Sequence, residues 1–236
     1  DPLVVFTLVS QMVIGAFLVL FLGAQRGLPV LTAASQGWTY PALLFGLLGA
    51  LTLALALSTM HLGKPHRFYR AFNNLRYSPV SREVAGIAVF YALLAGYTGL
   101  TALPFLSAWL PAGLVSAVTA VCGWGAALAG PVALYFMHAI YRIPARPFWN
   151  HWQVLASFYG SMLTLGGLAA GLVSALALWW TQSPYVPLLQ VLAWPVLAGL
   201  LLEGIGLVLH ARHLQQQGGE GAASHYRQTT TYGKTY

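Results

Sequence analysis

Charged residues are scarce in this chain of 236 residues. Asp, Glu, Lys and Arg together make up 6% of it, whereas soluble domains carry roughly 25%. Apolar residues make up 58%. Because so little charge cannot cover a soluble surface, the composition predicts an integral membrane protein.

Acidic residues are the rarest of the charged types. The sequence holds four acidic residues against eleven basic ones and has a net charge of +7. Most of the basic residues flank apolar runs, where lipid headgroups account for them better than nucleic acid does. Glu203 lies inside the apolar run LLLEGIG. Since a charge at mid-membrane costs about 2.5 kcal/mol or more, we expect Glu203 to face other helices, either as a hydrogen-bonded acid or on a proton path.

Cysteine is nearly absent. Cys122 is the one cysteine, and it lies within an apolar run. The chain therefore has no disulfide framework and no cysteine cluster for zinc or iron–sulfur ligation, so any such cluster would belong to a partner chain. The first apolar run, 2–22, is too long for a signal-peptide core and lacks a basic leader, so we expect a retained span.

Apolar runs of membrane-crossing length dominate the rest of the sequence. At about 20 residues per crossing, they predict an all-α bundle of about six transmembrane helices. We expect residues 1–214 to form one membrane domain and the polar residues 215–236 to form a flexible tail. Glycine pairs such as Gly46 with Gly49 and Gly167 with Gly171 predict close helix packing. The expected spans are 3–23, 40–60, 84–104, 112–139, 153–178 and 187–210.

The basic residues fall on one side of the predicted bundle. With six spans both termini share a face, and ten of the eleven Lys and Arg residues belong to that face. The positive-inside rule predicts that this face and the termini are cytoplasmic. A docking surface for an acidic soluble partner would produce the same bias. The ten residues are Lys64, Arg67, Arg70, Arg76, Arg82, Arg142, Arg146, Arg212, Arg227 and Lys234, and Arg26 alone lies opposite.

The segment 58–83, STMHLGKPHRFYRAFNNLRYSPVSRE, differs from an ordinary connecting loop. His61 ends the second span, Glu83 opens the third, and Ser81 is the expected helix cap between them. A quinone site needs groups that hydrogen-bond two oxygens and move protons, and histidine and glutamate do both. Placement of Glu83 in a first helical turn, or its pairing with Arg82 or Arg67, explains the carboxylate without a site.

Other histidines offer a different cofactor. His138, His151 and His210 lie near span ends, and two of them on facing helices would be able to ligate a b-type haem. A haem-bearing electron carrier is therefore one alternative to a quinone protein. A passive anchor, whose basic loops only dock soluble subunits, is another.

Three stretches carry a resemblance to a known family. These are PLVVFTLVSQMVIGAFLVL at the start, MHLGKPHRFYRAFNNLRYSPVSRE, and IPARPFWNHWQVLASFYGSMLTLG. They resemble the membrane-anchor subunits of the dimethyl sulfoxide reductase family, the DmsC-like anchors of molybdopterin oxidoreductases. The likeness covers the first two-thirds of the chain and extends more weakly to VPLLQVLAWPVLAGLLLEGIG.

The resemblance implies a three-part complex in a prokaryotic cytoplasmic membrane. Its other members would be a catalytic subunit with molybdopterin guanine dinucleotide and a subunit with four iron–sulfur clusters. The anchor would bind menaquinone or ubiquinone and hold no metal. By resemblance, His61 and Glu83 belong to the quinone site, with Gly63 and Arg67 from the same motif.

Two features of the sequence depart from the family pattern. Family members commonly have eight spans, and the apolar runs here predict six. The best-known members place the catalytic subunits outside the cytoplasm, whereas the charge bias places this loop inside. A cytoplasmic partner fits relatives that oxidise sulfite, so the resemblance leaves the direction of electron flow open.

Overall fold

The structure is a computed structural model that describes residues 2–27, 37–60, 64–103, 105, 108–142 and 150–216, with side chains as far as 213. Within these ranges every regular element is a helix, and six helices are long and apolar enough to cross a membrane. The predicted all-α fold is therefore confirmed. The elements are α1 (Pro2–Gln25), α3 (Thr39–Met60), the 3₁₀ helix η1 (Pro65–Asn74), α4 (Pro79–Ala102), α6 (Ala112–Tyr141), α7 (Gln153–Trp180) and α8 (Val186–Gln216).

The third span begins five residues earlier than predicted. Ser78 has an extended backbone, and its hydroxyl accepts a hydrogen bond from the Ser81 N–H at 3.3 Å. Pro79 follows at the first helical position, where its missing N–H costs nothing. The expected cap at Ser81 is therefore wrong: Ser78 caps α4, and Ser81 is buried in the first turn.

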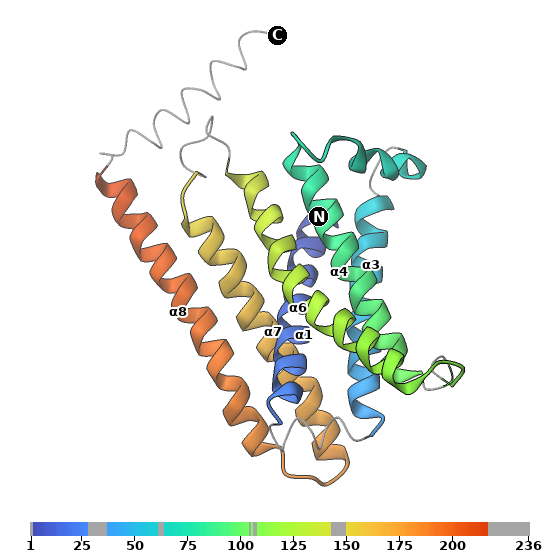
Figure 1. Ribbon diagram of the computed structural model, residues 1–236. Coiled ribbons are helices and arrows are strands. Elements are labelled where there is room, and N and C mark those ends of the chain that lie inside the picture. The colour runs from blue at the N-terminus through green and yellow to red at the C-terminus, as the bar shows by residue number, and fades with distance from the viewer. Residues whose placement is uncertain are drawn as a thin grey trace.

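Helix α1 is the central element of the bundle (Figure 1). It packs against α7, α3 and α6, and its middle is the most buried of the six spans. Phe17 and Phe21 of α1 stack on each other at 5.4 Å and meet the ring of Tyr97 edge-on. Such aromatic contacts add packing energy where lipid supplies no hydrophobic driving force.

Close helix approach depends on a few glycines. A side chain at Gly166 would place its Cβ 2.3 Å from the Gly15 carbonyl carbon, so α1 and α7 touch backbone to backbone there. The glycines predicted to allow close packing do not all do so. A Cβ at Gly167 would meet Val196 at 2.9 Å, whereas Gly46 and Gly49 face open space.

The start of α1 and η1 lie at the same end of the bundle (Figure 1). The start of α4, the end of α6 and the end of α8 lie at this end too, which we name the η1 face. Arg26 follows α1 at the opposite end. Within the described ranges, the predicted separation of charge is thus reproduced. Arg146 and the predicted flexible tail from residue 217 onward lie outside these ranges.

Candidate functional site

Two hydroxyl pairs join α3 to α4. The side-chain oxygens of Thr52 and Tyr91 are 2.9 Å apart, and those of Tyr40 and Tyr97 are 3.0 Å apart. The helices are antiparallel, so eight residues forward from Thr52 reach Met60, and eight residues back from Tyr91 reach Glu83. Counted from this pair at about 1.5 Å per residue, Met60 and Glu83 each lie roughly 12 Å toward the η1 face. Counted from the Tyr40–Tyr97 pair, Met60 comes level with Tyr77 instead, so the two residues share an end of the helices and not one fixed level.

Glu83 lies at the end of the buried stripe of α4. Ile87, Phe90 and Leu94 are fully buried, and they follow Glu83 at the helical spacing of four, three and four residues. The carboxylate therefore belongs to the bundle-facing side of α4 and not to its lipid-facing side. Glu83 is half-buried, so its carboxylate is partly shielded from the surroundings of the bundle while it remains near the η1 face.

The turn between η1 and α4 is held by an arginine. The Arg82 guanidinium donates from Nε to the Leu75 carbonyl at 2.9 Å and from Nη2 to the Arg76 carbonyl at 2.5 Å. The Tyr77 and Ser78 N–H groups both donate to the Asn74 carbonyl. Arg82 is thus committed to the loop backbone, which removes one of the two arginines considered as partners of Glu83.

The other predicted site residues are only partly described. Arg67 is exposed in the first turn of η1, and its N–H donates to the Lys64 carbonyl at 3.0 Å. Among the described contacts, none joins its side chain to Glu83. His61 and Gly63 lie outside the described residues, directly after Met60. The structure therefore places Glu83 and the end of α3 at the same end of the bundle and leaves the rest of the predicted site untested.

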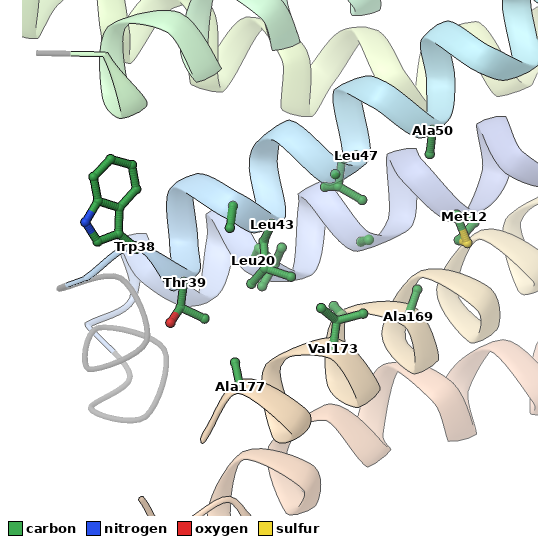
Figure 2. A pocket seen from close by; sticks show the side chains of 14 residues that line it. Met12, Leu20, Trp38, Thr39, Leu43, Leu47, Ala50, Ala169, Val173 and Ala177 are labelled. Carbon is green, nitrogen blue, oxygen red and sulfur yellow. The ribbon is translucent and has the colours of Figure 1, made fainter. Parts of the chain in front are cut away.

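An apolar cavity of about 580 Å³ lies among α1, α3 and α7 (Figure 2). It extends from Trp38 and Thr39 at the start of α3 to Ala50 and Met12 further along, and Gly46 opens into it. Neither Glu83 nor Arg67 lines it, and none of its described lining residues is ionisable. The cavity can accommodate hydrocarbon, but these residues offer no group that exchanges protons with a quinone ring. The only feature of the sequence that marks this cavity is Gly46, whose missing side chain leaves space there.

The intramembrane carboxyl of Glu203 has a partner on the neighbouring helix. Ser161 of α7 donates its hydroxyl to Glu203 of α8 at 2.6 Å. A Cβ at Gly160 would lie 2.9 Å from the Gly199 carbonyl oxygen, so the two helices are close enough for this bond. The expectation that Glu203 faces another helix is confirmed.

Two of the three histidines considered as haem ligands touch each other. The rings of His151 and His210 are 4.9 Å apart and tilted by 48°, so they touch directly and leave no room for a macrocycle between them. His138 is buried in α6, where one ring nitrogen bonds the Tyr135 carbonyl. Within the described residues no cluster of His, Cys, Asp or Glu has the arrangement of a metal site. His151 and His210 therefore do not form a facing ligand pair for the haem-carrier alternative.

His213 lies with His151 and His210, and it was not among the residues predicted from the sequence. Its ring stacks on that of His151 at 5.1 Å and 26°. The signal that points to it is the spacing of three residues between His210 and His213, which puts both on one face of a helix. His151 comes from a different helix terminus, so its presence there was not predictable from that spacing.

The fold and the charge distribution define a multi-pass membrane protein whose described cations gather at one end. The protein matches the family of DMSO reductase anchor subunits (DmsC) over residues 1–223 and belongs to that family. The C subunit of the anaerobic dimethyl sulfoxide reductase of Haemophilus influenzae is 32% identical over 171 residues, which cover 71% of this sequence and 55% of that protein. The YnfH subunit of an anaerobic dimethyl sulfoxide reductase of Escherichia coli K12 is 28% identical over 224 residues, 91% of this sequence and 72% of that protein.

The protein thus spans little more than half the length of the Haemophilus relative. No solved structure matches it. Membership of the family confirms the resemblance drawn from the sequence motifs, and with it the broad role of a membrane anchor in a reductase complex.

Proposed function

We propose that this protein anchors a molybdopterin oxidoreductase complex in a prokaryotic cytoplasmic membrane and binds a quinone or quinol at the η1 face, between α3 and α4. Electrons would pass between that quinone and an iron–sulfur partner subunit with four clusters, which in turn serves a catalytic subunit holding molybdopterin guanine dinucleotide. Family membership supports the anchor role. The quinone site and the partners are the proposal.

The observation that supports the proposal is that α3 ends and α4 begins at the η1 face, with Glu83 on the bundle-facing stripe of α4. His61 is the next residue in the sequence after Met60, so an imidazole close to that end of α3 would be available to act together with the carboxylate. Quinone reduction and oxidation move two protons with two electrons. Glu83 would exchange a proton at one quinone oxygen, and His61 would hydrogen-bond the other, with Gly63 and Arg67 beside them.

Apolar surface near the proposed site suits the isoprenoid tail of a quinone. Leu53, Leu57 and Met60 on the last turns of α3 are all exposed and therefore face lipid. A ligand arriving through the bilayer would reach the end of α3 along this surface. Packing of the tail against these side chains would depend on van der Waals contact, because lipid supplies no hydrophobic driving force there.

Basic and aromatic side chains of η1 suit a surface on which a soluble partner sits. The described residues Lys64, Arg67 and Arg70 are exposed, as are the rings of Phe68 and Tyr69. Exposed cations steer an acidic partner, and aromatic and arginine side chains are the residues that most often anchor interfaces. By the positive-inside rule, this face and the partner subunits would be cytoplasmic.

The test separates quinone chemistry from assembly. Glu83→Gln and His61→Ala complexes should lose quinone-coupled turnover by about 100-fold, because each removes a proton-handling group. Turnover with a soluble redox dye and membrane attachment should stay at the wild-type level. Glu203→Gln is the matched control, since it neutralises a carboxyl on another helix pair and should retain turnover.

Full quinone-coupled turnover in both Glu83→Gln and His61→Ala would refute the site. It would favour the passive anchor, in which the basic loop only docks soluble subunits. That alternative predicts that the soluble subunits detach from the membrane in Arg67→Gln and Arg70→Gln, with no change in quinone affinity in any variant.

A further inference from the structure

Three imidazole rings gather where α7 begins and α8 ends. His151 precedes α7, and its ring lies 4.9 Å from that of His210 and 5.1 Å from that of His213, both on α8. All three residues are half-buried. We name these three residues the imidazole cluster. The proposed quinone site uses none of them, and it lies on a different helix pair.

A guanidinium group, that of Arg142, lies near the imidazole cluster. Arg142, at the end of α6, donates from Nε to the Asn150 side-chain oxygen at 3.4 Å. Burial first, and then the nearby His210, His213 and Arg142, hold the pKa of His151 below its usual value. Among the described residues, no carboxylate neutralises this positive charge. The two described acidic residues are Glu83, on α4, and Glu203, which accepts a hydrogen bond from Ser161.

The hydrogen bonding of His151 leaves one ring nitrogen for a ligand. Its Nδ1 accepts the Gln153 N–H at 3.1 Å, which places the ring proton of the neutral form on Nε2. Nε2 is therefore a hydrogen-bond donor in both the neutral and the protonated ring. An anion is the natural complement of such a donor, and a metal ion is not.

The position of the imidazole cluster matches the depth of lipid headgroups. The membrane-spanning part of α7 starts at Gln153 and that of α8 ends at His213. Trp152 is exposed at the same level, as expected of an interfacial aromatic. Directly below, Leu207, Val208 and Leu209 are exposed along α8, so apolar surface continues from the imidazole cluster toward the bilayer interior.

We infer that the imidazole cluster and Arg142 bind the phosphodiester headgroup of an anionic phospholipid, with its acyl chains lying along the exposed apolar residues of α8. Basic pockets between helix ends are suited to such headgroups. A lipid fits better than an acidic protein because the three imidazoles are half-buried and lead into apolar surface, while Arg142 beside them is exposed. The inference does not depend on the proposed quinone site.

Binding should tighten as the pH falls. The groups that face the phosphate are Arg142 from the end of α6, His151 from the start of α7, and His210 and His213 from α8. Protonation of His151 and His210 adds positive charge beside Arg142, and the bound phosphate stabilises it. Each cation near an anionic lipid contributes about 1 kcal/mol, so two protonations correspond to roughly a 30-fold change in affinity.

The experiment uses the purified full-length protein in neutral detergent, with phosphatidylglycerol and phosphatidylcholine as probes in native mass spectrometry. The wild type should retain one phosphatidylglycerol in preference to phosphatidylcholine, about tenfold more at pH 5.5 than at pH 8. His151→Asn should abolish that preference while keeping the fold, because an asparagine side chain still accepts the Gln153 N–H. His66→Asn, an exposed histidine of η1, is the matched control and should bind as the wild type does.

Three results would overturn the inference. They are equal retention of both lipids by the wild type, an unchanged preference in His151→Asn, and displacement of the lipid by millimolar inorganic phosphate, which would indicate a site for the free ion. If His151→Asn does not fold, His213→Asn at the end of the α8 span serves as the second variant. A loss of preference there supports the headgroup site, and an unchanged preference contradicts it.

Discussion

The hydroxyl of Ser161 donates a 2.6 Å hydrogen bond to the carboxyl of Glu203 and thereby joins α7 to α8 within the membrane. Among the described elements, α8 makes its main contact with α7 alone. A Cβ at Gly199 would lie 2.4 Å from the Thr164 hydroxyl oxygen, so glycine is what allows the helices this close. This contact and the packing around it therefore determine how firmly the last span is attached.

Ser161→Ala should weaken the attachment of α8 by about 1 kcal/mol, the scale of a hydrogen bond between membrane helices. The measurement is thermal unfolding in detergent, together with the yield of a cysteine cross-link engineered between α7 and α8. Thr119→Ala is the control, because that hydroxyl bonds only the Val115 carbonyl of its own helix. Equal unfolding temperatures for both variants would show that the Ser161 bond contributes nothing measurable.

Gly166→Ala should destabilise the bundle by about 1–3 kcal/mol. The new methyl group would overlap the Gly15 backbone and push α1 and α7 apart. Gly46→Ala is the matched control, since nothing lies within 4 Å of a Cβ at that position. The free energy of unfolding of both variants, measured in the same detergent, checks the prediction. A loss for Gly46→Ala as large as that for Gly166→Ala would contradict the packing described here.

Acid should destabilise the protein through His151 when anionic lipid is removed. Its pKa is lowered by burial first and then by its cationic neighbours, so the unfolded protein takes up a proton near pH 6.5 before the folded protein does. Stability is therefore complete above that pH and falls as the pH drops toward the folded pKa. Unfolding temperatures between pH 5 and 8 should show this slope, and His151→Asn should flatten it.

His66→Asn provides the comparison for the acid experiment, because it removes an exposed histidine on the same face. Its pH profile should match that of the wild type. If His151→Asn and the wild type lose stability in parallel as the pH falls, another group is responsible and the assignment to His151 is wrong.

The spans were predictable because each one is specified locally. In hydrocarbon a helix satisfies its own backbone groups, so apolar length alone indicates where a span lies. The error at the third span, which begins at Pro79 and not at residue 84, also has a local cause. Ser78 and Pro79 form a helix start that is polar enough to escape a count of apolar residues.

The candidate site was only half predictable. The motif identified Glu83, and the structure places it on the bundle-facing stripe of α4, near the η1 face. The sequence offered Arg82 as a partner for that carboxylate, but its guanidinium bonds the carbonyls of Leu75 and Arg76. Arginine donors have many acceptors within reach, and only the path of the loop decides which are used.

The sequence by itself determined that this protein is a bundle of six membrane helices with its cations at one end, because length, apolarity and charge act span by span. The tertiary structure alone decided which spans are neighbours. Gly46 and Gly166 look alike in sequence, yet one opens into a cavity and the other brings α1 and α7 into backbone contact. The same packing brought His151 to His210 and His213, since contacts between distant segments depend on how whole helices fit together.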